Sequence, residues 1–271
     1  MGMKITLGQY LPGDTVIHKL DPRTKIVLMA AFIVMIFLVK SLPVFLVPAL
    51  YIVGTLLLAR IPVRYMISSL RPIRWLLVIM FILNLLLTDG ETTLVSFWII
   101  RITSESLRKA VFITLRLLLL VSGTSLLTLT TSPIELTDGL ERLMSPLSVL
   151  KFPAHEIAMM MTIALRFIPT LMEEVERIQK AQMSRGVDFT SGRLVSRLKS
   201  MIPILVPLFV SSFRRADELA TAMESRCYHG SEGRTRLHQL KMHRNDFLAF
   251  AIMALLAAAT VVLSKVLGGT I

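Results

Sequence analysis

The chain has 271 residues, of which 54% are hydrophobic, and its mean hydropathy is +0.68. A soluble domain of this length rarely reaches that value, so the composition favours a helical membrane protein. The net charge is +12, and the basic residues lie beside apolar segments. This pattern favours cytoplasmic membrane loops over a nucleic-acid-binding surface. Cys227 is the only cysteine, which excludes an internal disulfide and a cysteine-based metal cluster.

Apolar segments predict about five transmembrane helices in an all-α membrane protein, with four or six as the alternatives. The segments are residues 26–39, 42–59, 75–88, 110–131 and 246–263. The first and third are shorter than the roughly 20 residues of a typical span, and flanking Lys and Arg side chains can snorkel to lengthen them. Ser41-Leu42-Pro43 predicts a tight turn, so the first two segments form a helical hairpin. The short apolar stretch 92–100 is expected at the membrane interface.

The charges of the loops predict the orientation of the chain. The loop after the second apolar segment carries no acid and four arginines, Arg60, Arg64, Arg71 and Arg74. Such a loop is expected in the cytoplasm, which also places the N-terminus there and the C-terminus outside. The loop at residues 89–109 would then be outside, although its three cations run against the rule.

The segment 132–245 differs from the rest because it holds most of the chain's acidic residues. We predict a cytoplasmic helical coupling module here, between a membrane domain at 1–131 and a last span at 246–271. Ser132-Pro133-Ile134-Glu135 predicts a capped helix start. A second helix is expected to begin near Pro153, kink at Pro169 and stop at Gly186. A third is expected over 201–226, bent at its start by prolines 203 and 207.

The ends of the second and third predicted helices resemble each other at an offset of 41 residues. Residues 176–186 align with residues 217–227 in an acid, an aliphatic residue, an alanine and a terminal Ser-Arg-small triplet. The triplets are Ser184-Arg185-Gly186 and Ser225-Arg226-Cys227.

Two interpretations of these triplets stay open. An arginine in a last helical turn offsets the helix dipole by about 0.3–1 kcal/mol, and glycine is an ordinary residue after a helix. Alternatively, a guanidinium between small neighbours enters a partner's groove and binds a carboxylate there through two hydrogen bonds. Two similar tips would then suit two similar partner subunits, or the two halves of a dimer.

Three stretches give the sequence a resemblance to a known family. They are Ile-His-Lys-Leu-Asp-Pro-Arg-Thr-Lys at 17–25, Leu-Arg-Phe-Ile-Pro-Thr-Leu at 165–171 leading to Ala-Gln-Met-Ser-Arg-Gly at 181–186, and Ala-Met-Glu-Ser-Arg-Cys-Tyr at 222–228. Together with the order of spans, insert and final span, they resemble the transmembrane T component of energy-coupling factor (ECF) transporters. These are ATP-driven vitamin and metal-ion importers of prokaryotes, and the resemblance covers nearly the whole chain.

The resemblance implies a non-catalytic coupling subunit in the prokaryotic cell membrane. Each triplet would dock in a groove on one of two ABC-type ATPase subunits. The family's second triplet often ends in glycine, and Cys227 departs from that pattern while staying small. The apolar faces of the insert would hold a separate substrate-binding membrane (S) subunit, and a Met-rich surface suits changeable partners. The candidate contacts are Met144, Leu147, Met160, Met172, Leu205 and Phe209; for any one methionine, an ordinary core position is the alternative.

The sequence shows no chemistry of catalysis. It has no Gly-rich phosphate loop followed by Lys, so the chain is not expected to bind ATP, and no cofactor is expected. The five histidines are too scattered to predict a metal site. A self-sufficient ABC-type permease and a membrane enzyme remain as alternatives, but the spans offer few polar groups beyond Asn84 and Arg116. Arg116 is either a functional residue or one that snorkels from near a span end.

Overall fold

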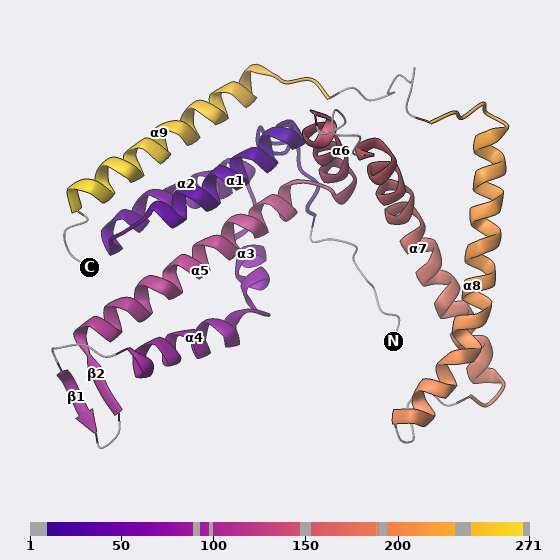
Figure 1. The fold of residues 1–271 in the computed structure, drawn as a ribbon, viewed down its shortest axis with the longest axis horizontal. Helices are drawn as coiled ribbons and strands as arrows, with labels where there is room; N and C mark the ends of the chain where they lie inside the picture. The colour runs from indigo at the N-terminus through magenta and orange to yellow at the C-terminus, as the bar shows by residue number, and fades with distance from the viewer. Residues whose placement is uncertain are drawn as a thin grey trace. The chain divides into compact units, whose positions relative to one another are not determined.

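The computed structural model describes residues 10–88, 93–97, 100–146, 153–187, 189, 194–230 and 240–267. The chain divides into two compact units (Figure 1). Met1–Leu140 and Gln239–Ile271 form the first, which we call the spanning unit, and Glu141–His238 form the second, which we call the insert unit.

The spanning unit consists of helices and one short hairpin. Its elements are α1 (Pro22–Leu38), the 3-10 turn η1 (Leu42–Phe45), α2 (Leu46–Ala59), α3 (Val63–Leu70), α4 (Arg74–Leu87), β1 (Thr93–Phe97), β2 (Ile100–Thr103), α5 (Ser104–Thr130), the first part of α6 (Pro133–Met144) and α9 (Arg244–Leu267). The predicted hairpin of α1 and α2 is confirmed, with Ser41 in the connection.

Helix α1 forms the centre of the spanning unit. Asp21 caps it, because its Oδ1 accepts the Arg23 N–H at 2.9 Å, and Pro22 occupies the first turn, where no N–H is needed. Phe32 and Ile36 are fully buried, and α1 packs against both α5 and α9, which run alongside it (Figure 1). Gly123 permits the approach of α5, since a Cβ there would lie 2.4 Å from the Phe32 ring.

The apolar helices confirm the all-helical membrane class. Three segments are long and apolar enough to cross a membrane: Leu42–Ala59, α5 and α9. Helices α3 and α4 make a fourth if the pair, bent by 62°, counts as one span. The first predicted span, residues 26–39, corresponds to α1, which is not among these segments because its 17 residues are at the lower end of the range for a span.

A short antiparallel hairpin interrupts the helices between α4 and α5. Strands β1 and β2 pair with Phe97 opposite Ile100 and Ser96 opposite Arg101. From the sequence we expected only an interfacial apolar stretch here, and no strands were predicted. Strand β2 leads directly into α5, whose first turn carries a capping box between Thr103 and Ser106.

The insert unit contains the end of α6 and two long helices, α7 (Ala154–Ser184) and α8 (Leu194–Glu224). The predicted start of α6 is confirmed, because the Ser132 N–H donates to Glu135 Oε2 and the Glu135 N–H donates to Ser132 Oγ. The predicted start of α8 is wrong, since the helix begins seven residues before Met201 and continues through both prolines. A proline removes one helical hydrogen bond, and a helix of 31 residues retains enough others to continue.

Candidate functional site

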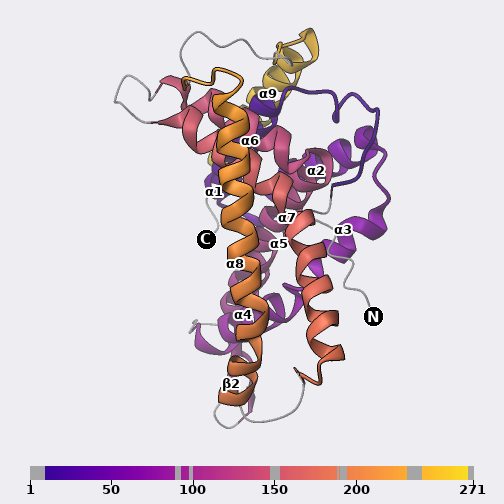
Figure 2. The same cartoon turned by 90° about the vertical axis from the view of Figure 1, so that its right-hand side faces the viewer.

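Helices α7 and α8 form an antiparallel pair. Figures 1 and 2 show the two helices running in opposite directions, so their C-terminal ends lie at opposite ends of the pair. One ion pair joins them, because Arg215 Nη2 donates to Glu174 Oε2 at 3.1 Å, and both side chains are partly buried.

This ion pair gives the two helices a nearly symmetric arrangement. Glu174 precedes Arg185 by eleven residues, and Arg215 precedes Arg226 by the same number. At about 1.5 Å per residue, each arginine lies about 16 Å of helix beyond the contact, in opposite directions. The 41-residue offset found in the sequence is therefore also the separation of Glu174 and Arg215, and the two tips lie at equivalent positions on either side of their ion pair.

The two tips share one backbone geometry. At the end of α7, the Gly186 N–H donates to Met183 O at 2.9 Å and the Val187 N–H donates to Gln182 O at 3.1 Å. At the end of α8, the N–H groups of residues 227 and 228 donate to the carbonyls of 224 and 223 at the same two distances. Both sets are Schellman caps, which satisfy carbonyls that a helix end leaves free.

The residue after each arginine adopts a left-handed backbone. Gly186 has φ of +87° and Cys227 has φ of +55°. Glycine adopts this conformation without steric cost, whereas a residue with a Cβ is disfavoured there by roughly 1–2 kcal/mol. The predicted stop of α7 at Gly186 is thus confirmed, and the second tip holds the same turn with a less suitable residue.

The arginines are the groups that project from the tips. The hydroxyls of Ser184 and Ser225 bond back to carbonyls of their own helices, at 3.1 and 3.0 Å. Arg185 and Arg226 are exposed, and the structure shows no hydrogen bond or ion pair to either guanidinium from the residues that it describes. Both donor groups are therefore available to a partner.

The candidate contacts for an S subunit divide by exposure. Met160, Leu205 and Phe209 are exposed, the first and last by about 60%. Met144 and Met172 are half-buried, and Leu147 lies outside the described residues. On α8 the exposed positions extend into a continuous apolar stripe at helical spacing, which also contains Met201, Ile202, Val206, Val210 and Phe213. We call these α8 residues, with Leu205 and Phe209, the apolar stripe.

A buried polar cluster at the start of α1 was not predicted from the sequence. Asp246 of α9 accepts the Asp21 N–H at 2.9 Å and the His243 N–H at 2.7 Å. Arg23 pairs with the Asp21 carboxylate at 2.7 Å and also donates to Leu240 O. We call this cluster, together with Lys25, the polar clasp.

Lys25 extends the polar clasp to the end of α5. Its buried ammonium donates to Thr130 O at 3.0 Å and to His18 O at 2.9 Å. Burial by itself would raise the pKa of Asp21, but the hydrogen bonds and charge of Arg23 outweigh it and hold that pKa below its ordinary value. Asp21 therefore stays ionised, and the clasp binds together the end of α5 and the start of α9, the two points that flank the insert.

Arg116 has a local structural role. Its Nη2 donates to Val39 O at 3.0 Å, and its guanidinium lies 4.7 Å from the centre of the Phe112 ring. Val39 is the C-cap of α1, so the arginine satisfies a carbonyl that the helix end leaves free. Asn84, the other polar group noted in the spans, donates to Met80 O of its own helix at 2.8 Å.

The described residues contain no group of three His, Cys, Asp or Glu side chains that could hold a metal ion. Apolar spanning helices, with a separate helical unit inserted in the sequence before α9, define the class of the molecule, a multi-span membrane protein. Comparison with known proteins identifies the family. Residues 13–237 match the CbiQ family, described as a cobalt transport protein.

Several relatives carry the name energy-coupling factor transporter transmembrane protein EcfT. The protein of Thermosediminibacter oceani is 52% identical over 258 residues, covering 95% of this chain and 97% of the relative. Those of Clostridium kluyveri and Bacillus subtilis are 49% and 45% identical, covering 98% and 93% of this chain and 98% and 95% of the relatives. The chain belongs to this family of energy-coupling factor transporter transmembrane proteins, and the resemblance found in the sequence is confirmed.

Proposed function

We propose that this chain is the coupling subunit of an ATP-driven importer, in which α7 and α8 pass the motion of two ABC-type ATPase subunits to a substrate-binding S subunit. The matched tips carry the proposal. Each presents one exposed arginine, free of described partners, on an identical cap, and the two lie at opposite ends of a nearly symmetric helix pair. A pair of similar ATPase subunits would meet equivalent groups at each tip.

The apolar stripe supports the second half of the proposal. It offers a row of exposed aliphatic and aromatic side chains on α8 without a charge among them. Apolar surface of this kind is typical of a contact with another apolar protein. The transported solute, a vitamin or a metal ion, would then be selected by the S subunit.

The spanning unit contains a cavity among α1, α2, α5 and α9, and its lining argues against the alternative of a self-sufficient permease. Its walls are almost entirely aliphatic and aromatic, whereas a path for a polar solute needs polar groups along its length. Uptake by the chain alone in proteoliposomes would favour that alternative over the coupling role.

Alanine substitution of the two arginines tests docking. Truncating one member of a desolvated charge pair at an interface costs about 2–5 kcal/mol, so Arg185→Ala or Arg226→Ala should weaken ATPase binding at least about 30-fold. Arg214→Ala is the matched control, because Arg214 is an exposed arginine on α8 whose partner, Glu218, is on the same helix. If a variant that carries both Arg185→Ala and Arg226→Ala binds both ATPases and transports like the wild type, the docking role is wrong.

Cys227 provides an independent probe at the second tip. It is the only cysteine of the chain and is exposed. A membrane-impermeant maleimide should label it in inside-out vesicles and not in intact cells, since we place the insert in the cytoplasm. Bound ATPase subunits should protect it from labelling, and labelling that is equal with and without them would count against docking at this tip.

A further inference from the structure

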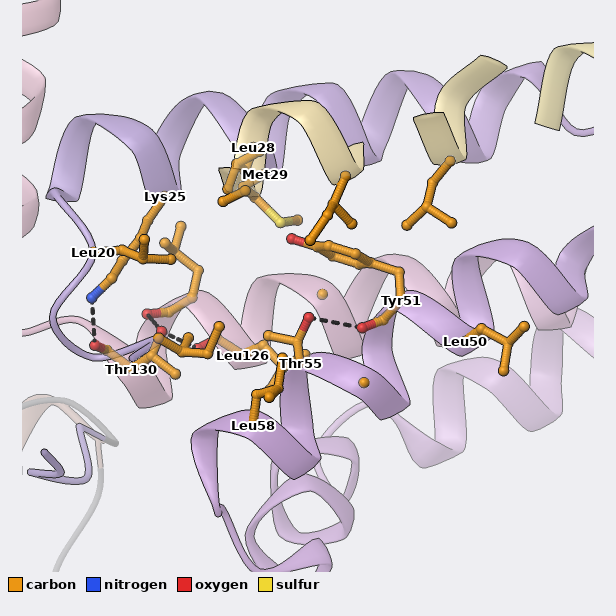
Figure 3. Close-up of a pocket in the computed structure, with 17 residues that line it drawn as sticks. Leu20, Lys25, Leu28, Met29, Leu50, Tyr51, Thr55, Leu58, Leu126 and Thr130 are labelled. Atoms are coloured by element: carbon orange, nitrogen blue, oxygen red, sulfur yellow. Dashed lines mark hydrogen bonds between the residues drawn. The ribbon is translucent and has the colours of Figure 1, made fainter. Parts of the chain in front are cut away.

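The spanning unit contains a cavity of about 260 Å³ between four helices. It lies among α1, α2, α5 and α9, and we call it the four-helix cavity. Figure 3 shows Lys25 and Thr130 at one end of it, Leu50 at the other and the Tyr51 ring between them. An engineered apolar cavity of about 150 Å³ stays dry and binds benzene, so a cavity of this size has room for a larger apolar group.

Lys25, Thr55 and Thr130, three polar residues that line the four-helix cavity, have hydrogen-bond partners within the protein. The Lys25 ammonium donates to two backbone carbonyls, and Thr55 Oγ1 donates to Tyr51 O at 2.7 Å. Water needs two to four polar partners to occupy a buried site, and the walls here are almost entirely aliphatic and aromatic. The cavity is therefore suited to an apolar occupant.

Gly54 lines the cavity and borders open space. A Cβ built on Gly54 would meet no atom within 4 Å, whereas one on Gly123 or Gly139 would collide with Phe32 or Pro22. Those two glycines permit helices to approach, but the packing of this chain does not need a glycine at position 54. Glycine within a helix is destabilising relative to alanine, and it commonly marks a place where another molecule comes close to the backbone.

The surroundings of the cavity indicate what that molecule is. Leu50, Leu58 and Ile252 line the cavity and are also exposed on the outer surface of the unit, by 59%, 62% and 47%. They belong to α2 and α9, two of the segments apolar enough to span a membrane. The cavity thus opens towards the hydrocarbon of the bilayer, whose acyl chains are the apolar solvent of these helices.

We propose that the four-helix cavity binds one acyl chain of a membrane phospholipid, inserted from the bilayer past Leu50 and Leu58. The acyl chain occupies the space beside Gly54 and completes the packing between α1 and α2. The site is independent of ATPase docking and concerns only the spanning unit.

Retention of lipid through purification tests the proposal. The full-length chain is exchanged into fresh detergent until loosely bound lipid is removed, and native mass spectrometry then counts the phospholipids that remain. We expect about one per chain in the wild type and a loss of most of it in Gly54→Leu, whose side chain fills the cavity. Ala254→Leu, which adds similar bulk on an exposed face of α9 away from the cavity, should retain lipid like the wild type.

A phospholipid with a photoreactive diazirine on its acyl chain locates the site. Cross-links should concentrate in residues 50–58 and 249–256 and decrease several-fold in Gly54→Leu. If that variant is not recovered folded, Leu50→Trp, which narrows the mouth from an exposed position, carries the same expectation. The proposal is overturned if the wild type retains no lipid, if the filled variants retain it equally, or if a photoreactive residue at position 50 captures a partner protein in place of lipid.

Discussion

Replacement of Asp246 by alanine is the sharpest test of the polar clasp. The Asp246 side chain is buried, and its two oxygens accept the N–H groups of Asp21 and His243 at 2.9 and 2.7 Å. Alanine would leave both donors without an acceptor. An unsatisfied buried donor costs about 1–3 kcal/mol, so Asp246→Ala should lower the free energy of unfolding by roughly 2–6 kcal/mol.

The assay is unfolding in mixed detergent micelles, with SDS as the denaturant and far-UV circular dichroism as the signal. Asp246→Asn keeps one acceptor oxygen and should lose an intermediate amount. Asp217→Ala, an exposed acid on α8, is the control and should change stability by less than about 0.5 kcal/mol. If Asp246→Ala costs no more than this control, the two N–H groups have other acceptors and the clasp does not hold the ends of the insert.

Three further predictions address the tips, the N-terminal segment and the apolar stripe. Residues 186 and 227 both have a left-handed backbone, so Gly186→Ala should lower the free energy of unfolding by about 1 kcal/mol and Cys227→Gly should raise it by up to about 1 kcal/mol. The same SDS titration measures both, and changes of the same sign in the two variants would refute this. Burial and then the Lys25 charge lower the pKa of His18 below its ordinary 6.5. The unfolded chain therefore binds the proton more readily, so stability should fall as the pH drops below about 6.5, and less so in His18→Gln. Phe209→Glu should release the S subunit in a pull-down while both ATPases stay bound, and loss of all three partners would indicate misfolding.

Much of the helical layout could be predicted from local sequence signals. The capping box at Ser132 and the glycine stop at residue 186 are contained within a few residues, and both appear as predicted. The repeat at the tips was visible for the same reason, since each copy lies within one helix end. The structure added that the copies share a cap and flank one ion pair, which depends on how α7 and α8 pack.

The polar clasp could not be predicted because its members are distant in sequence. Asp246 lies 225 residues from Asp21, and nothing near either residue indicates the other. In the sequence, the stretch around Asp21 stands out only through the family resemblance, and Asp246 lies at the start of an apolar segment. An acid at the start of an apolar segment was the one available signal, because an ionised carboxylate requires partners when it leaves water.

Helix α2 provides an internal comparison for the two tips. Helix α2 also ends in a Schellman cap, with N–H bonds from Arg60 to Leu57 O and from Ile61 to Leu56 O, and with φ of +53° at Arg60. A Schellman cap that includes an arginine is therefore not in itself a docking signal. In α2 the arginine itself is the left-handed residue of the cap, whereas Arg185 and Arg226 directly precede the left-handed residues of their own caps. The order of the residues within the cap, and the repetition of that order about the contact of Glu174 with Arg215, distinguish the two tips from an ordinary helix end.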